Sequence, residues 1–320
     1  MPKLKLALYW AGACGGCDVA VLDVNEKILD VANLADIVFW PIALDFKYHH
    51  VEAMPDKSID VCLFNGCVRS SEQEHIAKML RAKSKVLVSF GSCACFGGIP
   101  ALANLSTRAE IMERAYIEAP SNENPNKTLP QTKVSVPEGE LTLPELFEDV
   151  LTLAQVVPVE YFVPGCPPTV DLILKVVSAL ATNSLPPVGA VIASDKTLCD
   201  ECDRKKENKK IARIYRTQEI IPDPQKCLLE QGLLCMGPAT RGGCGALCVK
   251  VNITCRGCFG PPAGVADQGA KLVSAIASIY EAKDEKDIAR MVNEVVDPAG
   301  TFYRFGMSNS MLKRKRSQKR

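Results

Sequence analysis

Fifteen cysteines constrain this 320-residue chain more than any other feature of its sequence. Cysteines at such density indicate either a disulfide framework or metal ligation. The chain runs from Met1 into an apolar segment without a signal peptide or a twin-arginine motif, and it has no stretch of the roughly 18 to 20 apolar residues that span a membrane. We therefore expect a cytoplasmic location and no membrane span, and reducing conditions there favour metal sites over disulfides.

Composition narrows the choice of partner. With 47% apolar residues, the chain can bury the cores of two domains. Lys and Arg number 38 against 37 for Asp and Glu, so the formal net charge is +1. A net charge so close to zero produces no long-range electrostatic field that would attract nucleic acid or an anionic membrane. We therefore expect a protein or a small molecule as partner.

Short apolar runs alternate with helical patterns over residues 1–184. This alternation predicts an α/β domain with a flavodoxin-like, doubly wound parallel sheet. The expected strands are Lys5–Tyr9, Ile37–Pro41, Ile59–Asn65, Lys85–Phe90 and Val157–Val163, and the expected helices are Asp18–Leu34, Ser71–Ala82, Thr107–Ile117 and Thr169–Thr182. Residues 120–144, rich in Pro, Asn, Thr and Glu, predict a surface insertion.

The pattern changes over residues 185–296, where Cys and Gly become frequent and periodic strands disappear. Eight of the cysteines fall in this part of the chain. So little regular structure with so many potential ligands predicts a small, irregular domain folded around metal. Residues 297–320 form a C-terminal extension whose basic tail, 313–320, is either a solvated end or a docking element.

The first cysteine constellation lies at the ends of the expected strands. Cys14 and Cys17 form a C-x2-C pair after the first strand, Cys93 follows the fourth, and Cys166 follows the fifth. Because the carboxyl ends of parallel strands meet at one edge, these four thiols are expected to converge there. They would complete a four-cysteine set for a 4Fe-4S cluster.

Other interpretations of these thiols remain open at this point. The C-x2-C pair alone is also typical of a redox dithiol or half of a zinc site. Cys95 is a weaker candidate ligand than Cys93, although spacing does not separate them. Cys62 is expected in the core, and Cys67, at another strand end, is expected near the cluster without ligating it.

The eight later cysteines match the number required by two four-cysteine sites, which two 4Fe-4S clusters or two zinc ribbons would both satisfy. A cluster already expected in the first domain favours clusters here, since zinc has no redox chemistry. The basic run from Arg204 to Lys210 is either a docking site for an acidic partner or a solvated helical face.

These motifs resemble the small subunits of NiFe hydrogenases over nearly the whole chain. The resemblance rests on the Cys14-Gly15-Gly16-Cys17 turn, on the runs from Gly91 to Gly98 and from Pro164 to Pro168, and on the later cysteine series. It implies a proximal cluster on Cys14, Cys17, Cys93 and Cys166, a medial cluster on Cys244, Cys248, Cys255 and Cys258, and a distal cluster on Cys199, Cys202, Cys227 and Cys235. Cysteine at positions 199 and 248 implies three 4Fe-4S clusters. Periplasmic relatives carry His at the first position, and many carry Pro at the second.

The resemblance also implies a function and partners. The segment from Gly12 to Val21 resembles the cytoplasmic methyl-viologen-reducing, coenzyme F(420)-non-reducing subgroup. Its implied role is an oxidoreductase subunit that relays electrons without catalysing the reaction, because the NiFe centre lies in a large subunit. A 2Fe-2S acceptor subunit and heterodisulfide reductase are further implied partners. The alternatives are a cluster subunit related to complex I, which would show adjacent cysteines and no second cluster domain, and a zinc-bound structural module.

Overall fold

A computed structural model of the chain describes residues 3–312. Its centre is a parallel sheet with the strand order β2-β1-β3-β5-β9. These strands are β1 (Leu4–Trp10), β2 (Ala35–Phe39), β3 (Ile59–Asn65), β5 (Ser84–Phe90) and β9 (Tyr161–Val163). The order confirms the flavodoxin-like, doubly wound prediction, with the carboxyl ends of all five strands on one edge.

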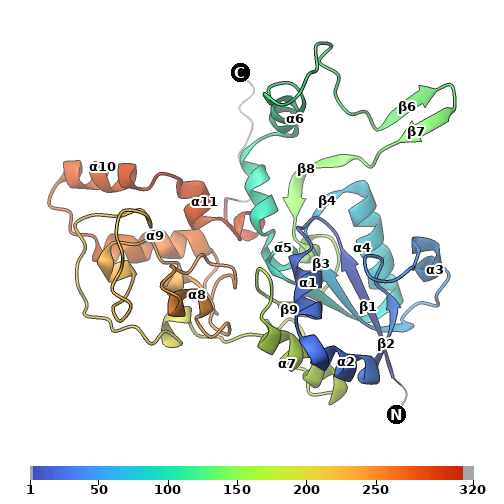
Figure 1. Ribbon diagram of the computed structural model, residues 1–320, viewed down its shortest axis with the longest axis horizontal. Coiled ribbons are helices and arrows are strands. Elements are labelled where there is room, and N and C mark those ends of the chain that lie inside the picture. Colours follow the sequence, from blue (N-terminus) through green and yellow to red (C-terminus); the bar gives the residue numbers. More distant parts are fainter. Residues whose placement is uncertain (1–2, 313–320) are drawn as a thin grey trace.

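Alternate side chains of each strand enter two separate cores. Leu6 and Leu8 of β1 pack on one face of the sheet, under α1 (Gly16–Leu22), α2 (Ile28–Leu34) and α7 (Val170–Ala181). Ala7 and Tyr9 pack on the other, under α3 (Tyr48–Glu52), α4 (Ser71–Lys83) and α5 (Ser92–Phe96). A strand that is covered on both faces needs apolar side chains at its odd and at its even positions, because these point to opposite faces of the sheet. Figure 1 shows these layers around the sheet.

Two expected elements are shorter in the structure. The helix predicted over Asp18–Leu34 is wrong as one element, because Asn25 adopts a left-handed backbone with φ of 55° and separates α1 from α2 through a short 3-10 turn, Asn25–Lys27. The strand predicted from Val157 begins only at Tyr161, since Pro158 cannot donate to a sheet ladder.

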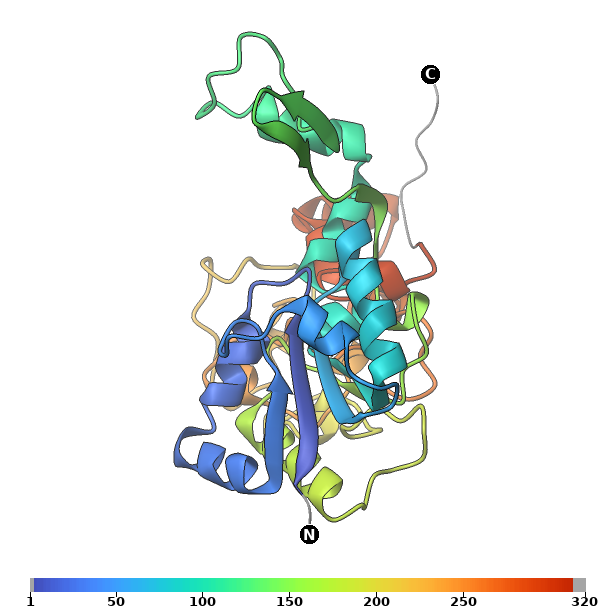
Figure 2. The ribbon, with the colours of Figure 1, turned by 90° about the vertical axis from the view of Figure 1, so that its right-hand side faces the viewer.

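The expected insertion is a projecting arm. Helix α6 (Arg108–Tyr116) leads into it, and the hairpin β6 (Lys133–Val136) and β7 (Gly139–Thr142) lies within it, far from the sheet in Figures 1 and 2. The chain returns through β8 (Leu146–Leu151), which pairs with β4 (Val68–Ser70). Thr107 and Glu110 form a reciprocal cap that fixes the start of α6.

The cysteine-rich region has its own core but no strand pairs longer than single bridges within the described residues. Its helices are α8 (Leu247–Lys250), α9 (Gln268–Ile279) and α10 (Glu285–Glu294), and α11 (Pro298–Phe302) follows in the C-terminal extension. The domain boundaries stay a prediction, and the basic tail at 313–320 lies outside the described residues. None of the described helices is both long and apolar enough to cross a membrane.

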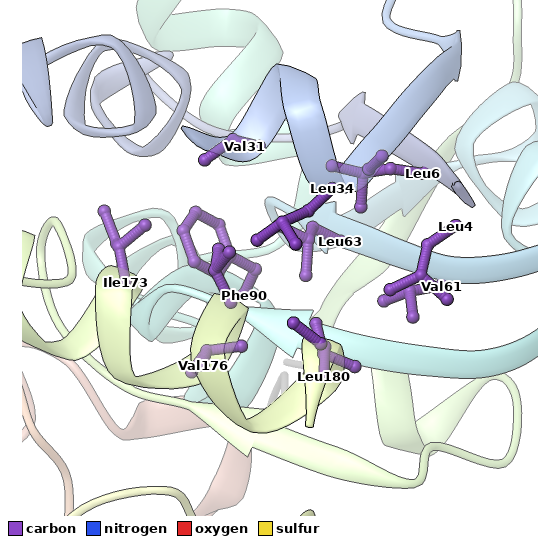
Figure 3. Close-up of a pocket in the computed structure, with 13 residues that line it drawn as sticks. Leu4, Leu6, Val31, Leu34, Val61, Leu63, Phe90, Ile173, Val176 and Leu180 are labelled. Atoms are coloured by element: carbon purple, nitrogen blue, oxygen red, sulfur yellow. The ribbon is translucent and has the colours of Figure 1, made fainter. Parts of the chain in front are cut away.

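An apolar pocket of about 30 Å³ lies between the sheet, α2 and α7 (Figure 3). Leu63, Phe90 and Val176 are among its lining residues, which are all aliphatic or aromatic. It lies among the side chains of the flavodoxin-like core and contains no cysteine.

Candidate iron-sulfur sites

The first four thiols gather at the carboxyl edge of the sheet, and we call Cys14, Cys17, Cys93 and Cys166 the proximal set. Cys14 and Cys17 flank the start of α1, Cys93 lies in the first turn of α5, and Cys166 follows β9. Two backbone hydrogen bonds of 2.7 Å, from Gly91 N to Val163 O and from Ser92 N to Gly165 O, join the last two turns. Strand topology therefore brings residues far apart in the sequence to one place.

Two glycines make room for sulfur in the proximal set. Gly91 has φ of 86°, and a Cβ there would collide with the Cys17 sulfur. Gly98 has φ of 60°, and a Cβ there would collide with the sulfur and backbone of Cys93. Both glycines thus allow the close approach of backbone to thiol and also a backbone of positive φ that other residues rarely adopt.

Burial and mutual proximity oppose ionisation of the proximal thiols. Burial raises the pKa of Cys17 well above its usual range, and the neighbouring thiols of Cys93 and Cys166 raise it further. Burial likewise raises the pKa of Cys93 to about 12, with added contributions from Cys67 and Cys166. Thiolates crowded in this way require a cation among them, which is what the iron of a cluster would supply.

Three thiols lie apart from this set in ways that suit the core. Cys62 is fully buried in β3, and Cys95 contacts the carbonyl oxygens of Ser89 at 3.2 Å and Val163 at 3.6 Å. Cys67 is buried and donates to Gly12 O at 2.9 Å, beside the loop that carries Cys14. Each of these thiols is thus buried among protein groups.

The second group, which we call the distal set, lines one hollow of about 490 Å³ in the irregular region; its members are Cys199, Cys202, Cys227 and Cys235. Burial raises the pKa of Cys199 to about 12, Lys206 opposes that rise, and the other three thiols add to it. Burial also raises the pKa of Cys235, while the Gly237 backbone offsets part of the rise by hydrogen bonding to its sulfur.

The third group, the medial set, lines a hollow that also reaches Cys166; its members are Cys244, Cys248, Cys255 and Cys258. Burial raises the pKa of Cys244, and backbone hydrogen bonds from Ala246 and Leu247 oppose the rise. Burial raises the pKa of Cys258 to about 12, and a backbone hydrogen bond from Cys166 opposes it. The medial set therefore adjoins the proximal set directly.

The medial set also adjoins the distal set. Met236, next to Cys235, donates its backbone N–H to the carbonyl oxygen of Cys255 at 2.9 Å. Burial raises the pKa of Cys255, and the thiols of Cys235 and Cys258 raise it further. The three sets thus form a continuous series in the order proximal, medial, distal.

The arrangement of donors fits polynuclear clusters. The four thiols of one set line each of the two hollows of the cysteine-rich region, and such a set suits a cluster in which each thiolate binds a different iron. Backbone N–H groups directed at several sulfurs are the contacts that tune such clusters.

Two residues of these sites escaped the sequence-based prediction. The Ser92 hydroxyl donates to the carbonyl oxygen of Cys258. In the sequence, only the position of Ser92 directly before Cys93 indicated that it could lie at a site. Arg204 is buried, whereas Lys205, Lys206, Lys209 and Lys210 are exposed, and the segment from Arg204 to Lys210 is not helical. The expected helix was therefore wrong, and Arg204 does not belong to the solvated face. Carbonyl groups from distant loops bind the Arg204 guanidinium, which periodicity cannot reveal.

Together the sheet and its cysteine-bearing edge define the class of α/β iron-sulfur subunits found in hydrogenases and related oxidoreductases. The family model for the 20 kDa subunit of NADH ubiquinone oxidoreductase matches residues 14–180. That match covers the flavodoxin-like part, including the proximal set, and stops before the distal and medial sets.

Full-length relatives define the family more closely. The chain is 44% identical over 318 residues to the iron-sulfur subunit of the F420-non-reducing hydrogenase of Archaeoglobus profundus, covering 98% of each chain. It is 38% identical over 315 residues to the corresponding F420-non-reducing hydrogenase subunit of Methanothermobacter thermautotrophicus, covering 97% of this chain and 96% of the relative. The chain belongs to this family of hydrogenase iron-sulfur subunits, and the predicted resemblance is confirmed.

Solved structures agree on the fold. A chain of the NAD+-reducing [NiFe]-hydrogenase in the H2-reduced state superposes with a TM-score of 0.50 at 25% identity, covering 59% of this chain and 96% of that one. A chain of the Dm. baculatum [NiFeSe]-hydrogenase gives a TM-score of 0.54 at 16% identity over 82% of this chain and 96% of that one. The second likeness extends into the cysteine-rich region.

Proposed function

We propose that this chain is the electron-transfer subunit of a NiFe hydrogenase, relaying electrons from dihydrogen oxidation in a large subunit to an acceptor subunit. One observation carries the proposal: twelve thiols form three adjoining groups of four. In this proposal the proximal, medial and distal sets each hold one 4Fe-4S cluster. When bound, the clusters supply one-electron redox centres along the chain.

The protein's own contribution is position, burial and polarity. The turns after β1, β5 and β9 fix the proximal thiols at an edge of the sheet, where Cys14 and Cys166 are exposed and Cys17 is buried. An edge of this kind can face a catalytic partner while its inner side excludes water. The medial set lies between the other two sets, with Cys255 buried and Cys248 exposed, and the distal set lines a separate hollow.

Exposed apolar residues support contact with a large subunit near Cys14. Trp10 ends β1 at this edge, and Val19 and Leu22 lie in α1, which begins beside Cys14; they are 37%, 56% and 54% exposed. Apolar side chains so exposed beside a functional site are typical of a protein interface. The large subunit, carrying the NiFe centre, is the partner that we propose for this surface.

The acceptor and the location belong to the same proposal. We propose a 2Fe-2S subunit as the acceptor, with heterodisulfide reductase as a further partner, since the full-length relatives include methanogen hydrogenase subunits. We also propose a cytoplasmic location, because all fifteen cysteines are free thiols and reducing conditions preserve them.

Metal analysis of the anaerobically purified complex tests the proposal. Three clusters in this chain predict about twelve irons and as many acid-labile sulfides per chain beyond those of the partner subunits, with EPR signals on reduction. About four irons accompanied by zinc would overturn the three-cluster assignment and favour zinc in the irregular region. A nickel-containing subunit that co-purifies distinguishes a hydrogenase from relatives of complex I.

Substitutions assign the ligands. Cys166→Ala should remove the proximal signal and about four irons per chain, because one ligand of one cluster is lost. Cys62→Ala is the matched control, since Cys62 is buried in β3 among core residues. Equal iron loss in both variants would contradict the proximal assignment.

A further inference from the structure

Arg204 is a buried cation whose entire guanidinium is engaged. Its Nε lies 3.3 Å and its Nη2 2.9 Å from the carbonyl oxygen of Val249. Nη1 donates to the carbonyl oxygens of Asp223 at 2.9 Å and Lys226 at 3.0 Å, and Nη2 also donates to Asn252 Oδ1 at 2.7 Å. These five contacts match the five N–H donors of a guanidinium.

These contacts place Arg204 between the loops of two cysteine sets. Arg204 itself follows Cys202 by two residues, Lys226 directly precedes Cys227, and Val249 directly follows Cys248. Its side chain also lines the hollow of the distal set. One side chain therefore joins two distal loops to a medial loop.

The positive charge of Arg204 lacks a carboxylate partner. Among the salt bridges of residues 3–312, none involves Arg204, and every acceptor around its guanidinium is a neutral carbonyl or amide oxygen. Asp223 offers only its backbone, and its carboxylate lies 3.9 Å from Lys226 Nζ. A buried charge without a counter-ion is costly, because hydrogen bonds to neutral groups only partly replace water.

Thiols of both sets lie beside these contacts: Cys199, Cys202, Cys227 and Cys235 line the same hollow as Arg204, and Cys248 directly precedes Val249, whose carbonyl oxygen Arg204 binds. As thiolates holding a cluster, the distal and medial sets would each carry net negative charge, and each additional electron would increase it. A fixed cation in a medium of low dielectric stabilises the more negative state. An arginine also keeps its charge at any physiological pH.

Building on the proposed function, we propose that Arg204 is the shared counter-charge of the distal and medial sets and raises the reduction potentials of the clusters they hold. We expect no such effect on the proximal set, because its thiols lie in the turns after β1, β5 and β9, and the Arg204 guanidinium binds none of these turns. Electrons leaving the proximal cluster would then move to clusters of higher reduction potential.

Arg241 provides a matched control. It is also buried and also binds backbone oxygens, those of Ser194 and Pro261. Its Nη1, however, pairs with Asp195 Oδ1 at 2.9 Å. Removing its charge therefore tests the loss of a buried guanidinium that already has a counter-ion.

The experiment is an EPR-monitored redox titration of the intact hydrogenase complex carrying Arg204→Gln, Arg204→Lys or Arg241→Gln, with iron counted in each. Arg204→Gln should lower the midpoint potentials of the distal and medial signals and leave the proximal one unchanged. Arg204→Lys should keep those potentials near the wild type, because it retains the charge although it loses the planar fork. Arg241→Gln should shift them less than Arg204→Gln does.

Each other outcome has a definite meaning. Unchanged potentials in Arg204→Gln with full iron would overturn the inference while leaving the proposed function intact. If Arg204→Gln loses iron, the distal and medial midpoint potentials of Arg204→Lys decide the question. Potentials equal to those of the wild type support the charge role, and lowered potentials overturn it. Iron loss from both variants would assign Arg204 a purely structural role and also overturn the inference. A wild-type complex without distal and medial clusters would instead overturn the proposed function, and this inference with it.

Discussion

The Ser92 hydroxyl donates a hydrogen bond to the carbonyl oxygen of Cys258, a residue 166 positions further along the chain. Ser92 precedes Cys93 of the proximal set, and Cys258 belongs to the medial set. This side-chain contact therefore joins the flavodoxin-like sheet to the cysteine-rich region, at the point where two of the proposed clusters adjoin.

Ser92→Ala should weaken this tie. The carbonyl oxygen of Cys258 loses its Ser92 donor, which costs about 1–3 kcal/mol when a buried acceptor is left unpaired. The thermal unfolding temperature of the complex should fall accordingly. Ser278→Ala is the control, since that exposed hydroxyl binds only Ala275 O on its own helix; an equal fall in both variants would contradict the special role of Ser92.

Gly98→Ala should reduce iron at the proximal set. A Cβ at this position meets the Cys93 sulfur, and the backbone there, with φ of 60° and ψ of −161°, lies in a region that is almost confined to glycine. Gly264→Ala also places a Cβ on a backbone of positive φ, 76°, but that Cβ has open space around it. Iron analysis should therefore show a loss for Gly98→Ala alone, and full iron in both proteins would refute the steric argument.

The buried thiol of Cys62 should make stability sensitive to alkaline pH. Burial raises the pKa of Cys62 from 9.0 to about 12 in the folded chain. Above pH 9 the unfolded chain releases this proton while the folded chain keeps it, so stability falls as pH rises toward 12. The slope approaches about 1.4 kcal/mol per pH unit for one group.

Cys62→Val removes that contribution. The unfolding temperature of the variant, compared with the wild type from pH 7 to 10.5, should show a constant difference up to about pH 9. Above that pH the difference should move in favour of the variant. A difference that stays constant over the whole range would show that Cys62 does not titrate in this way.

The segment 305–310 packs against the proximal loop as a C-terminal latch. The Gly98 N–H donates to Phe305 O at 3.1 Å, and Gln155 Nε2 donates to Ser308 O at 3.0 Å. Truncation after Arg304 should therefore lower proximal iron, whereas truncation after Leu312 should retain it. Equal iron in the two truncated chains would show that the latch does not support the site.

The sequence was sufficient to predict the sheet and the positions of its cysteines. Strands that are apolar at both phases mark burial on two faces, and the parallel order then places Cys14, Cys93 and Cys166 at one edge. The break at Asn25 escaped prediction, because a polar residue with a left-handed backbone leaves little trace in helical periodicity.

Contacts between distant loops were beyond such reasoning. Arg204 stands in a basic run that looks like solvated surface, and only the folded chain brings the carbonyl groups of Val249 and Lys226 to it. The same holds for the contact between Ser92 and Cys258. The spacing of apolar residues along a chain indicates which side of a local helix or strand is buried. These interactions depend instead on which distant loops come together in the folded chain.

The C-terminal latch also affects the order of events during synthesis. Phe305 and Ser308 contact the Gly97-Gly98 turn beside Cys93, yet they are made about two hundred residues later. A nascent chain whose sheet has already formed on the ribosome therefore still lacks one wall of its first site. If the proximal set holds the proposed cluster, the final surroundings of that cluster are complete only after residues 305–310 have been made.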